Sequence, residues 1–299
     1  MGVAEVPDHG QGWLMAAQSE DIMVWCNGSL VSAREIRVSP LDTGFTVGAG
    51  VFETLLAFGG DPCAFARHHA RLAQSAAVFG LDLPALEELR AVCRSVAQAS
   101  GHQRARLRIT VTCGPGLPGA TLPGGPPTIM VVAVEAAVPT HPANLFTVPW
   151  RRNPESAISG IKSTSYAENL LAFAAAKAAG ADEAVMLNTR GELCEGATSN
   201  LWYVVDGRLC TPGLDSGCLP GVTRQIVLEL CDEAGVAVDQ SPRGAEAMAR
   251  ADAVFLTSSI RGVHAAGACD GRMLDSAAHP LVASLGHALD AGRAAKRWD

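Results

Sequence analysis

Residues 158–162 read Ile-Ser-Gly-Ile-Lys and lead into a segment with helical spacing at 166–178. A lysine at the end of an apolar segment is unusual, because lysine side chains are normally solvated. Burial would lower the pKa of Lys162 and favour the free amine, the form that attacks carbonyl groups. The chain has only two other lysines, Lys177 and Lys296. On this context alone, a surface lysine beside a helix is the alternative interpretation.

Glu195 is the second residue of interest. It lies in the stretch 194–200, Cys-Glu-Gly-Ala-Thr-Ser-Asn, just before a predicted strand. A carboxylate here would pair with the protonated ring nitrogen of a cofactor and hold the charge in place. An ordinary acidic residue in a turn is the alternative.

A phosphate site is indicated at 219–224, Leu-Pro-Gly-Val-Thr-Arg, where a helix is expected to begin. Free backbone N–H groups and the positive end of the helix dipole suit a phosphate dianion. Arg71 would add a forked donor, and Ser258 and Ser259 would add hydroxyls. Thr223 acting only as a helix N-cap is the commoner role and stays open.

Three arginines share one face of a predicted strand. Arg104, Arg106 and Arg108 alternate with apolar residues over 104–113, which is the period of a strand. They would bind substrate carboxylates, with a solvated charged face as the alternative. An amine, a ring-nitrogen partner, a phosphate cup and an anion site are what an enzyme using pyridoxal 5′-phosphate requires.

The bulk properties indicate a soluble, reduced, cytoplasmic protein. Apolar residues make up 48% of the 299 residues and charged residues 18%, which is ordinary for a globular chain. A net charge of −7 argues against nucleic acid as a partner. No apolar run reaches the roughly 20 residues that a membrane span requires. Nine cysteines without metal-ligand spacing indicate scattered free thiols and no metal site.

The order of expected elements favours an α+β (mixed α/β) fold. Strands are expected at 22–26, 51–58, 104–113, 128–134, 145–148, 183–187, 201–205 and 253–256, and helices at 67–79, 85–97, 166–178, 221–234 and 280–296. The Asn-Gly pair at 27–28 predicts a hairpin turn after the first strand. A proline-containing stretch at 135–143 is interpreted as a linker. It divides the chain into domains at 22–136 and 144–299, with residues 1–21 expected to be flexible. The helix at 166–178 is expected to bury Tyr166, Leu170, Phe173 and Ala174.

The stretch 114–119, Gly-Pro-Gly-Leu-Pro-Gly, matches the dinucleotide-binding pattern. Two prolines interrupt it, and the residues that follow cannot open a helix to meet a pyrophosphate. We therefore interpret this stretch as a loop.

Several stretches together resemble the class IV aminotransferases, the fold type IV enzymes that use pyridoxal 5′-phosphate. The matching stretches, in chain order, are 27–28, 41–54, 68–72, 160–163, 180–184, 195–200, 219–224 and 251–259. The resemblance implies a small N-terminal α/β domain, a larger domain with a pseudo-barrel, and the cofactor at their interface. It also implies a homodimer.

The resemblance assigns roles by position. Lys162 matches the Schiff-base lysine, which also shuttles the proton, and Glu195 matches the partner of the pyridine nitrogen. Tyr166 is similar to a tyrosine that contacts the cofactor's phenolate oxygen in some members, whereas others use the position held here by Phe52. The residues matching the phosphate cup are Arg71, Val222, Thr223 and Ser259.

Within the family, 4-amino-4-deoxychorismate lyase is the favoured member, releasing 4-aminobenzoate and pyruvate. Thr54 matches a threonine near the reacting centre of the lyases, where its hydroxyl would assist proton transfer. Residues 152–154 also look like the lyases. The Arg-x-His and Tyr-x-Arg carboxylate traps of the transaminases are replaced by arginines at 104, 106 and 108. A substrate with two carboxylates would suit these arginines.

Two alternatives remain. The first is an aminotransferase acting on D-amino acids or branched-chain amino acids with a 2-oxo acid acceptor. Residues 260–266 lack the Pro-Val pair that often follows the serines in this family, which leaves the substrate open. The second is a catalytically silent binding or scaffolding protein, against which Lys162 and Glu195 weigh.

Overall fold

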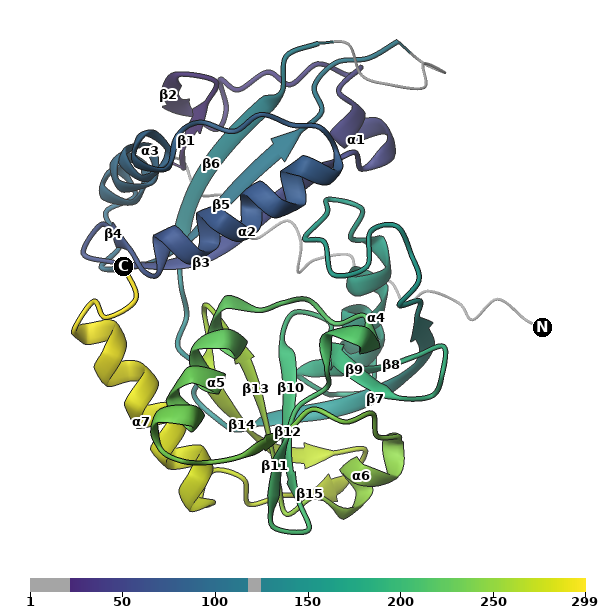
Figure 1. Ribbon diagram of the computed structural model, residues 1–299. Coiled ribbons are helices and arrows are strands. Elements are labelled where there is room, and N and C mark those ends of the chain that lie inside the picture. Colours follow the sequence, from purple (N-terminus) through teal and green to yellow (C-terminus); the bar gives the residue numbers. More distant parts are fainter. Residues whose placement is uncertain (1–21, 118–124) are drawn as a thin grey trace.

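The computed structural model describes residues 22–117 and 125–299, so the segment expected to be flexible, 1–21, lies outside it. The described chain forms two sheets stacked one above the other, with helix α2 lying along the boundary between them (Figure 1). Of the rejected dinucleotide-binding pattern, residues 114–117 are described and form no helix.

The first sheet has six strands in the order β2-β1-β6-β5-β3-β4. Its strands are β1 (Met23–Cys26), β2 (Ser29–Ser32), β3 (Gly50–Phe58), β4 (Asp61–Pro62), β5 (Arg104–Thr112) and β6 (Thr128–Glu135), and its helices are α1 (Thr43–Val47), α2 (Phe65–Val78) and α3 (Leu86–Ala99). Asn27 and Gly28 both have positive φ, 42° and 100°, as the predicted hairpin turn requires.

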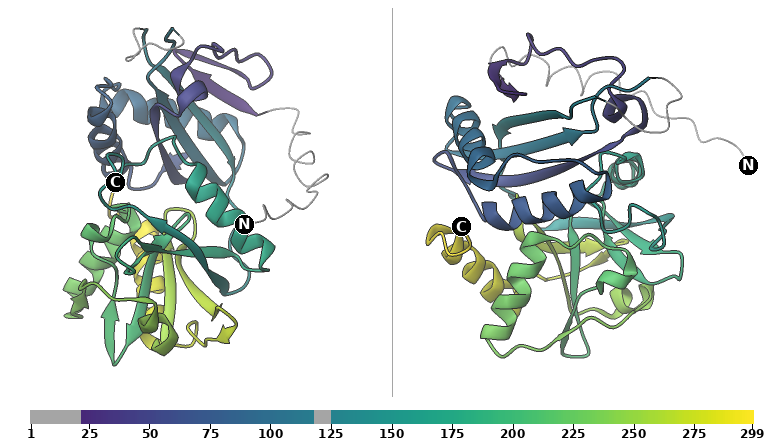
Figure 2. Two further views of the ribbon diagram at one scale, coloured as in Figure 1. Left: turned by 90° about the vertical axis from the view of Figure 1, so that its right-hand side faces the viewer. Right: turned by 45° about the horizontal axis from the view of Figure 1, so that its top comes forward.

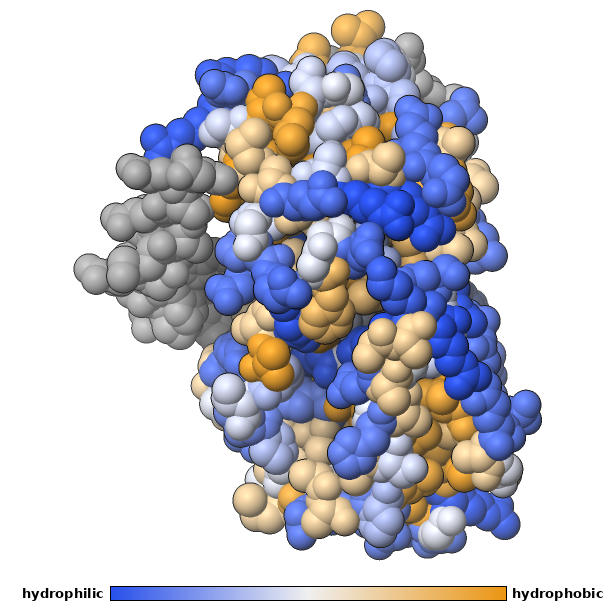
Figure 3. All heavy atoms as spheres, turned by 90° about the vertical axis from the view of Figure 1, so that its left-hand side faces the viewer, coloured by the Kyte–Doolittle hydropathy of each residue, from blue (hydrophilic) through white to orange (hydrophobic). Residues whose placement is uncertain are grey.

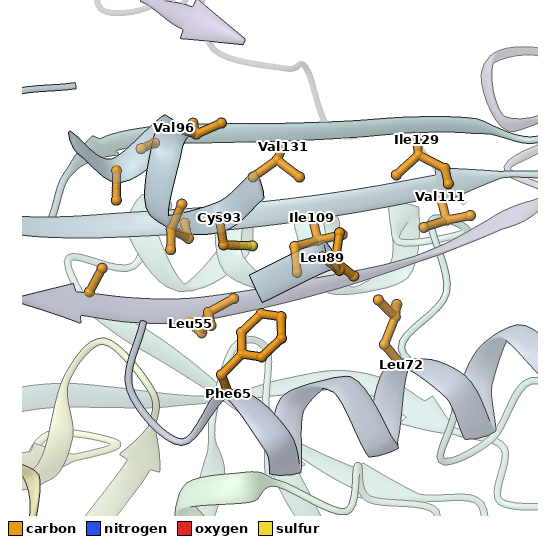
Figure 4. Close-up of a cluster of buried hydrophobic side chains, with 14 of the residues drawn as sticks. Leu55, Phe65, Leu72, Leu89, Cys93, Val96, Ile109, Val111, Ile129 and Val131 are labelled. Carbon is orange, nitrogen blue, oxygen red and sulfur yellow. The ribbon is translucent and has the colours of Figure 1, made fainter. Parts of the chain in front are cut away.

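One face of this sheet packs against helices α2 and α3, and the other face lines a cavity. Leu55 and Ile109 point from β3 and β5 into a cluster with Phe65, Leu72 and Leu89 of helices α2 and α3 (Figure 4). Side chains alternate along a strand, so the residues between them face the opposite side, toward the second sheet.

The second sheet has nine strands, of which eight follow the order β12-β11-β10-β13-β14-β7-β8-β9, and β15 pairs with β14. Its strands are β7 (Ala143–Arg152), β8 (Glu183–Asn188), β9 (Leu193–Gly196), β10 (Asn200–Val205), β11 (Arg208–Cys210), β12 (Val238–Asp239), β13 (Ala253–Ser258), β14 (Gly262–Cys269) and β15 (Arg272–Met273). Its helices are α4 (Ala167–Ala178), α5 (Val222–Glu233), α6 (Ala245–Arg250) and α7 (Pro280–Ala294), with a 3₁₀ turn at Leu214–Ser216.

The chain passes from the first sheet to the second through residues 136–142, within the stretch interpreted as a linker. The two halves also meet at the C-terminus, which lies beside β4 and the start of α2 (Figures 1 and 2). There the Asp299 carboxylate accepts a hydrogen bond from the backbone N–H of Ala64 at 2.5 Å.

The expected buried face of α4 was wrong at two of its four positions, while Tyr166 and Phe173 are half-buried. Leu170 is 61% exposed and Ala174 is also exposed, whereas Asn169, Ala172 and Ala176 are buried. The Asn169 amide donates a hydrogen bond to the carbonyl oxygen of Ala197 at 2.8 Å, and this bond lets a polar residue face inward. The spacing of apolar residues along the helix does not reveal a hydrogen bond of this kind, which joins residues 28 positions apart.

Polar and apolar residues are interspersed over the face in Figure 3, without a continuous apolar band. Within the described ranges, no helix is long and apolar enough to cross a membrane.

Candidate active site

A cavity of about 910 Å³ lies between the two sheets and receives side chains from both. Its walls include most of the residues that the sequence singled out: Thr54, Arg71, Arg106, Arg108, Lys162, Tyr166, Glu195, Val222, Thr223, Ser258 and Ser259. Arg104 is absent from this wall. Residues more than 200 positions apart in the chain are therefore brought to one site.

Lys162 lies in the wall on a segment that pairs with the first sheet. Its carbonyl oxygen accepts a hydrogen bond from the N–H of Phe52 at 2.9 Å, and the Thr164 N–H donates to the Gly50 carbonyl oxygen at 2.9 Å. The lysine amine lies 4.4 Å from the centre of the Phe52 ring. Burial, reinforced by the charge of Arg71, lowers the pKa of Lys162 from 10.5 to about 8. A reactive fraction of free amine is thus present near neutral pH.

Glu195 lies in strand β9 and is buried, which excludes the turn interpretation. One carboxylate oxygen accepts the N–H of Leu219 at 2.9 Å, and the other accepts from the Arg152 guanidinium at 3.3 Å. Burial raises the pKa of Glu195, while Arg152 and the Leu219 N–H oppose that rise by favouring the ionised form. These two partners fix the carboxylate at the cavity wall.

Helix α5 begins at Val222, within the stretch where the sequence predicts a phosphate cup. Gly221 is the N-cap residue, and no side chain occupies the free N–H groups there. A Cβ on Gly221 would stand 1.9 Å from the side-chain oxygen of Asn200, so a larger residue requires the Asn200 side chain or the loop to shift. Arg71 reaches the same loop, because its guanidinium donates to the Pro220 carbonyl oxygen at 3.1 Å. Thr223 makes no side-chain cap for this helix, so the N-cap alternative does not apply.

Behind Arg71 lies a buried carboxylate that sequence reasoning missed. Glu53 is fully buried and accepts two bonds of 2.7 Å from Arg71 and one of 2.8 Å from His68. Its signal was a charged residue in register with Val51 and Leu55, on the face of β3 that packs against the helices. Arg152 and Asn200 lie in stretches that resemble the family, but no role was assigned to either side chain from the sequence.

The three arginines of β5 have different surroundings. Arg104 turns away and donates to the carbonyl oxygens of Ala136, Ala137 and Ile260. Arg106 is exposed within the cavity wall, and Arg108 lies with its guanidinium 3.9 Å from the Phe52 ring centre.

Tyr166 contacts Phe52 edge-on at 5.2 Å between ring centres. Its hydroxyl donates to the Ala197 carbonyl oxygen at 2.8 Å, and burial raises the pKa of this phenol. Thr54 stands opposite Arg108 in the β3–β5 register, with its side chain on the cavity face. Thr54, Arg106 and Arg108 therefore form one polar wall across the cavity from the second sheet.

The chain belongs to the amino-transferase class IV family, whose model matches residues 50–268. A relative from Methanocaldococcus jannaschii, provisionally assigned as a branched-chain-amino-acid aminotransferase, is 31% identical over 262 residues, covering 85% of this chain and 90% of its own.

Solved structures agree with this family. The branched-chain aminotransferase of Thermoproteus uzoniensis superposes with a TM-score of 0.85 at 27% identity, covering 92% of this chain and 95% of its own. A Legionella pneumophila protein provisionally assigned as 4-amino-4-deoxychorismate lyase gives a TM-score of 0.82 at 25% identity, covering 87% and 96%. The predicted family, fold class and enzymatic nature are therefore confirmed.

The predicted cofactor, pyridoxal 5′-phosphate, is confirmed as that of the family. The residues present fit it. Lys162 offers an amine with a lowered pKa, and Glu195 a fixed carboxylate for the ring nitrogen. The start of α5 offers uncapped N–H groups behind Gly221, where a Cβ would intrude.

Proposed function

We propose that this class IV enzyme is a lyase that converts 4-amino-4-deoxychorismate to 4-aminobenzoate and pyruvate. The observation that carries the proposal is the polar wall of the cavity, where Thr54, Arg106 and Arg108 lie on one face of the first sheet. Two guanidinium groups suit the two carboxylates of this substrate.

Each residue has a defined task in this proposal. The bound cofactor supplies an electron sink for the substrate carbon that bears the amine. Lys162 removes the proton from the carbon that bears the amine, the neighbouring C–O bond to the enolpyruvyl group breaks, and the substrate ring becomes aromatic, so this proton passes to the leaving group and is not returned to the ring. Glu195 holds the charge of the ring nitrogen of the cofactor. The start of α5 and Arg71 hold the phosphate. The Thr54 hydroxyl donates a proton toward the leaving enolpyruvyl group, which departs as pyruvate.

A branched-chain aminotransferase is the second candidate. It is favoured by the relatives named above, and by the apolar side chains of Phe52, Val132 and Val134 in the same cavity. An aminotransferase specific for D-amino acids belongs to the same alternative. The silent-scaffold alternative is disfavoured because the lysine and the carboxylate are both in place.

The deciding experiment supplies aminodeoxychorismate without any 2-oxo acid. Release of 4-aminobenzoate and pyruvate supports the lyase, whereas conversion of leucine or D-alanine only in the presence of 2-oxoglutarate supports the aminotransferase. Thr54→Val should lower lyase turnover by about a hundredfold, the lower range for losing general acid catalysis. Thr54→Ser keeps a hydroxyl and should restore most of it. Equal turnover in both variants would remove Thr54 from the mechanism.

The covalent attachment of the cofactor to Lys162 can be tested without any substrate. Borohydride treatment of the purified protein should bleach the cofactor absorbance and leave the cofactor mass on the peptide containing Lys162.

Three further predictions belong with this proposal. We propose residues 22–136 and 144–299 as the two domains, a homodimer as the assembled form, and the cytoplasm as its location. Light scattering of the purified protein measures the assembly, and a monomer mass would contradict the dimer.

A further inference from the structure

A chain of hydrogen bonds leads from the buried core to the phosphate cup. Glu53 accepts from Nδ1 of His68 at 2.8 Å, and Nε2 of His68 lies 3.2 Å from the Ser259 hydroxyl oxygen. His68 is 2% exposed, whereas Ser259 lies in the cavity wall. His68 thus connects a buried charge with a residue of the cup.

The direction of each bond follows from the chemistry of Glu53. Burial alone would raise the pKa of this carboxyl, but Arg71 and His68 hold it well below its ordinary value, so Glu53 is ionised. An ionised carboxylate only accepts, and Nδ1 of His68 must therefore carry a proton. In a neutral imidazole Nε2 is then an acceptor, and the Ser259 hydroxyl donates to it.

This direction conflicts with phosphate binding. Phosphate oxygens at neutral pH are acceptors, so they require a donor from Ser259. Its single hydroxyl proton is already directed at His68. The conflict disappears when Nε2 gains a proton, because His68 then donates to the Ser259 oxygen and releases the hydroxyl proton for the phosphate.

We propose that His68 is a positioning residue that takes up a proton when the cofactor phosphate binds, turning the Ser259 hydroxyl toward that phosphate. The inference rests on the phosphate site proposed at the start of α5. The charged groups that face His68 are Glu53 on β3, Arg71 on its own helix and Lys162 on the segment paired with β3. Glu53 and an arriving phosphate favour the imidazolium, whereas Arg71 and Lys162 oppose it.

The pH dependence has a definite sign. Burial lowers the pKa of His68 in the cofactor-free protein, so His68 is neutral there above the ordinary histidine range. A bound dianion raises that pKa. Affinity for the phosphate should therefore rise as the pH falls from the pKa of His68 in the bound protein to its pKa in the free protein. Below the pKa of the free protein the affinity should level off.

The test uses pyridoxamine 5′-phosphate, which carries the phosphate but no aldehyde to react with Lys162. Calorimetric titrations in buffers of different ionisation enthalpy measure proton uptake, at about one unit above the ordinary histidine pKa of about 6.5. The wild type should take up a sizeable fraction of a proton per site. His68→Asn, whose amide can still donate to Glu53, should lose that fraction. His69→Asn is the matched control, since His69 contacts the Pro84 carbonyl oxygen instead.

Ser259→Ala is a second test variant in case His68→Asn prevents folding. It should also reduce the proton uptake that accompanies binding of the probe. Equal uptake in wild type, His68→Asn and Ser259→Ala would overturn the proposal. A purely structural role for His68 would weaken binding equally at every pH, which would also overturn it. Failure of the folded wild type to bind the probe at any pH would instead contradict the phosphate site itself.

Discussion

The backbone N–H of Phe52 donates a hydrogen bond to the carbonyl oxygen of Lys162 at 2.9 Å. Strand β4 pairs with β3 only at residues 57 and 58, so the other end of that edge of β3 is open to the lysine segment. The lysine amine belongs by sequence to the second half of the chain but is positioned by the first. This pairing brings Lys162 into the same cavity as Thr54 and the arginines.

Cofactor capture by Lys162 should follow a shifted pH profile. The neutral amine is the nucleophile, and the pKa of this lysine is about 8 instead of 10.5. The rate of absorbance change after mixing cofactor-free protein with pyridoxal 5′-phosphate should rise with pH and level off above about 8. A rate that continues to climb toward 10.5 would show that Lys162 is solvated.

Loss of the carboxylate charge should reduce turnover more than it reduces folding. Glu195→Gln removes the charged partner that we propose for the ring nitrogen, a loss of roughly 1.5–3 kcal/mol or about ten- to a hundredfold in rate. Steady-state turnover is the measurement. Glu168→Gln is the control, because Glu168 is the exposed partner of Arg152 and such pairs contribute little. Equal losses in both variants would contradict the assigned role.

Adding one methyl group to the phosphate loop should weaken cofactor binding. In Gly221→Ala the new Cβ would meet the Asn200 side chain at 1.9 Å, so either the loop moves or Asn200 gives up its hydrogen bond to the Leu219 carbonyl oxygen of the same loop. We expect at least a tenfold rise in the dissociation constant by fluorescence titration, which corresponds to about 1.4 kcal/mol. Gly286→Ala, in α7, meets only an ordinary contact at 4.0 Å and should be neutral or slightly stabilising.

Two of the three arginines of β5, Arg106 and Arg104, should differ in role, the first as a substrate residue and the second as a structural residue. Arg106→Gln should raise KM about ten- to a hundredfold while leaving the cofactor affinity unchanged, because a charged contact to a carboxylate is lost. Arg104→Gln should leave KM unchanged and lower the urea midpoint, because Arg104 contacts the carbonyl oxygens of Ala136, Ala137 and Ile260. The opposite pattern would reverse these assignments.

The sequence by itself determined the anchors of this protein. The alternation at 104–112 predicted β5 and the Asn-Gly pair predicted the first hairpin, while the lysine after an apolar run and the glycine at a helix start indicated the cofactor site that we propose. These features are local, because a strand period, a turn and a helix start each depend on neighbouring residues.

Only the tertiary structure decided which polar groups act together. It buried Glu53 beneath Arg71 and His68, paired Arg152 with Glu195, and withdrew Arg104 from a row that the sequence presents as uniform. Those partners are 15 to 156 positions apart in the chain. A buried charge is stable only beside its partner, and the identity of that partner is a property of the folded chain.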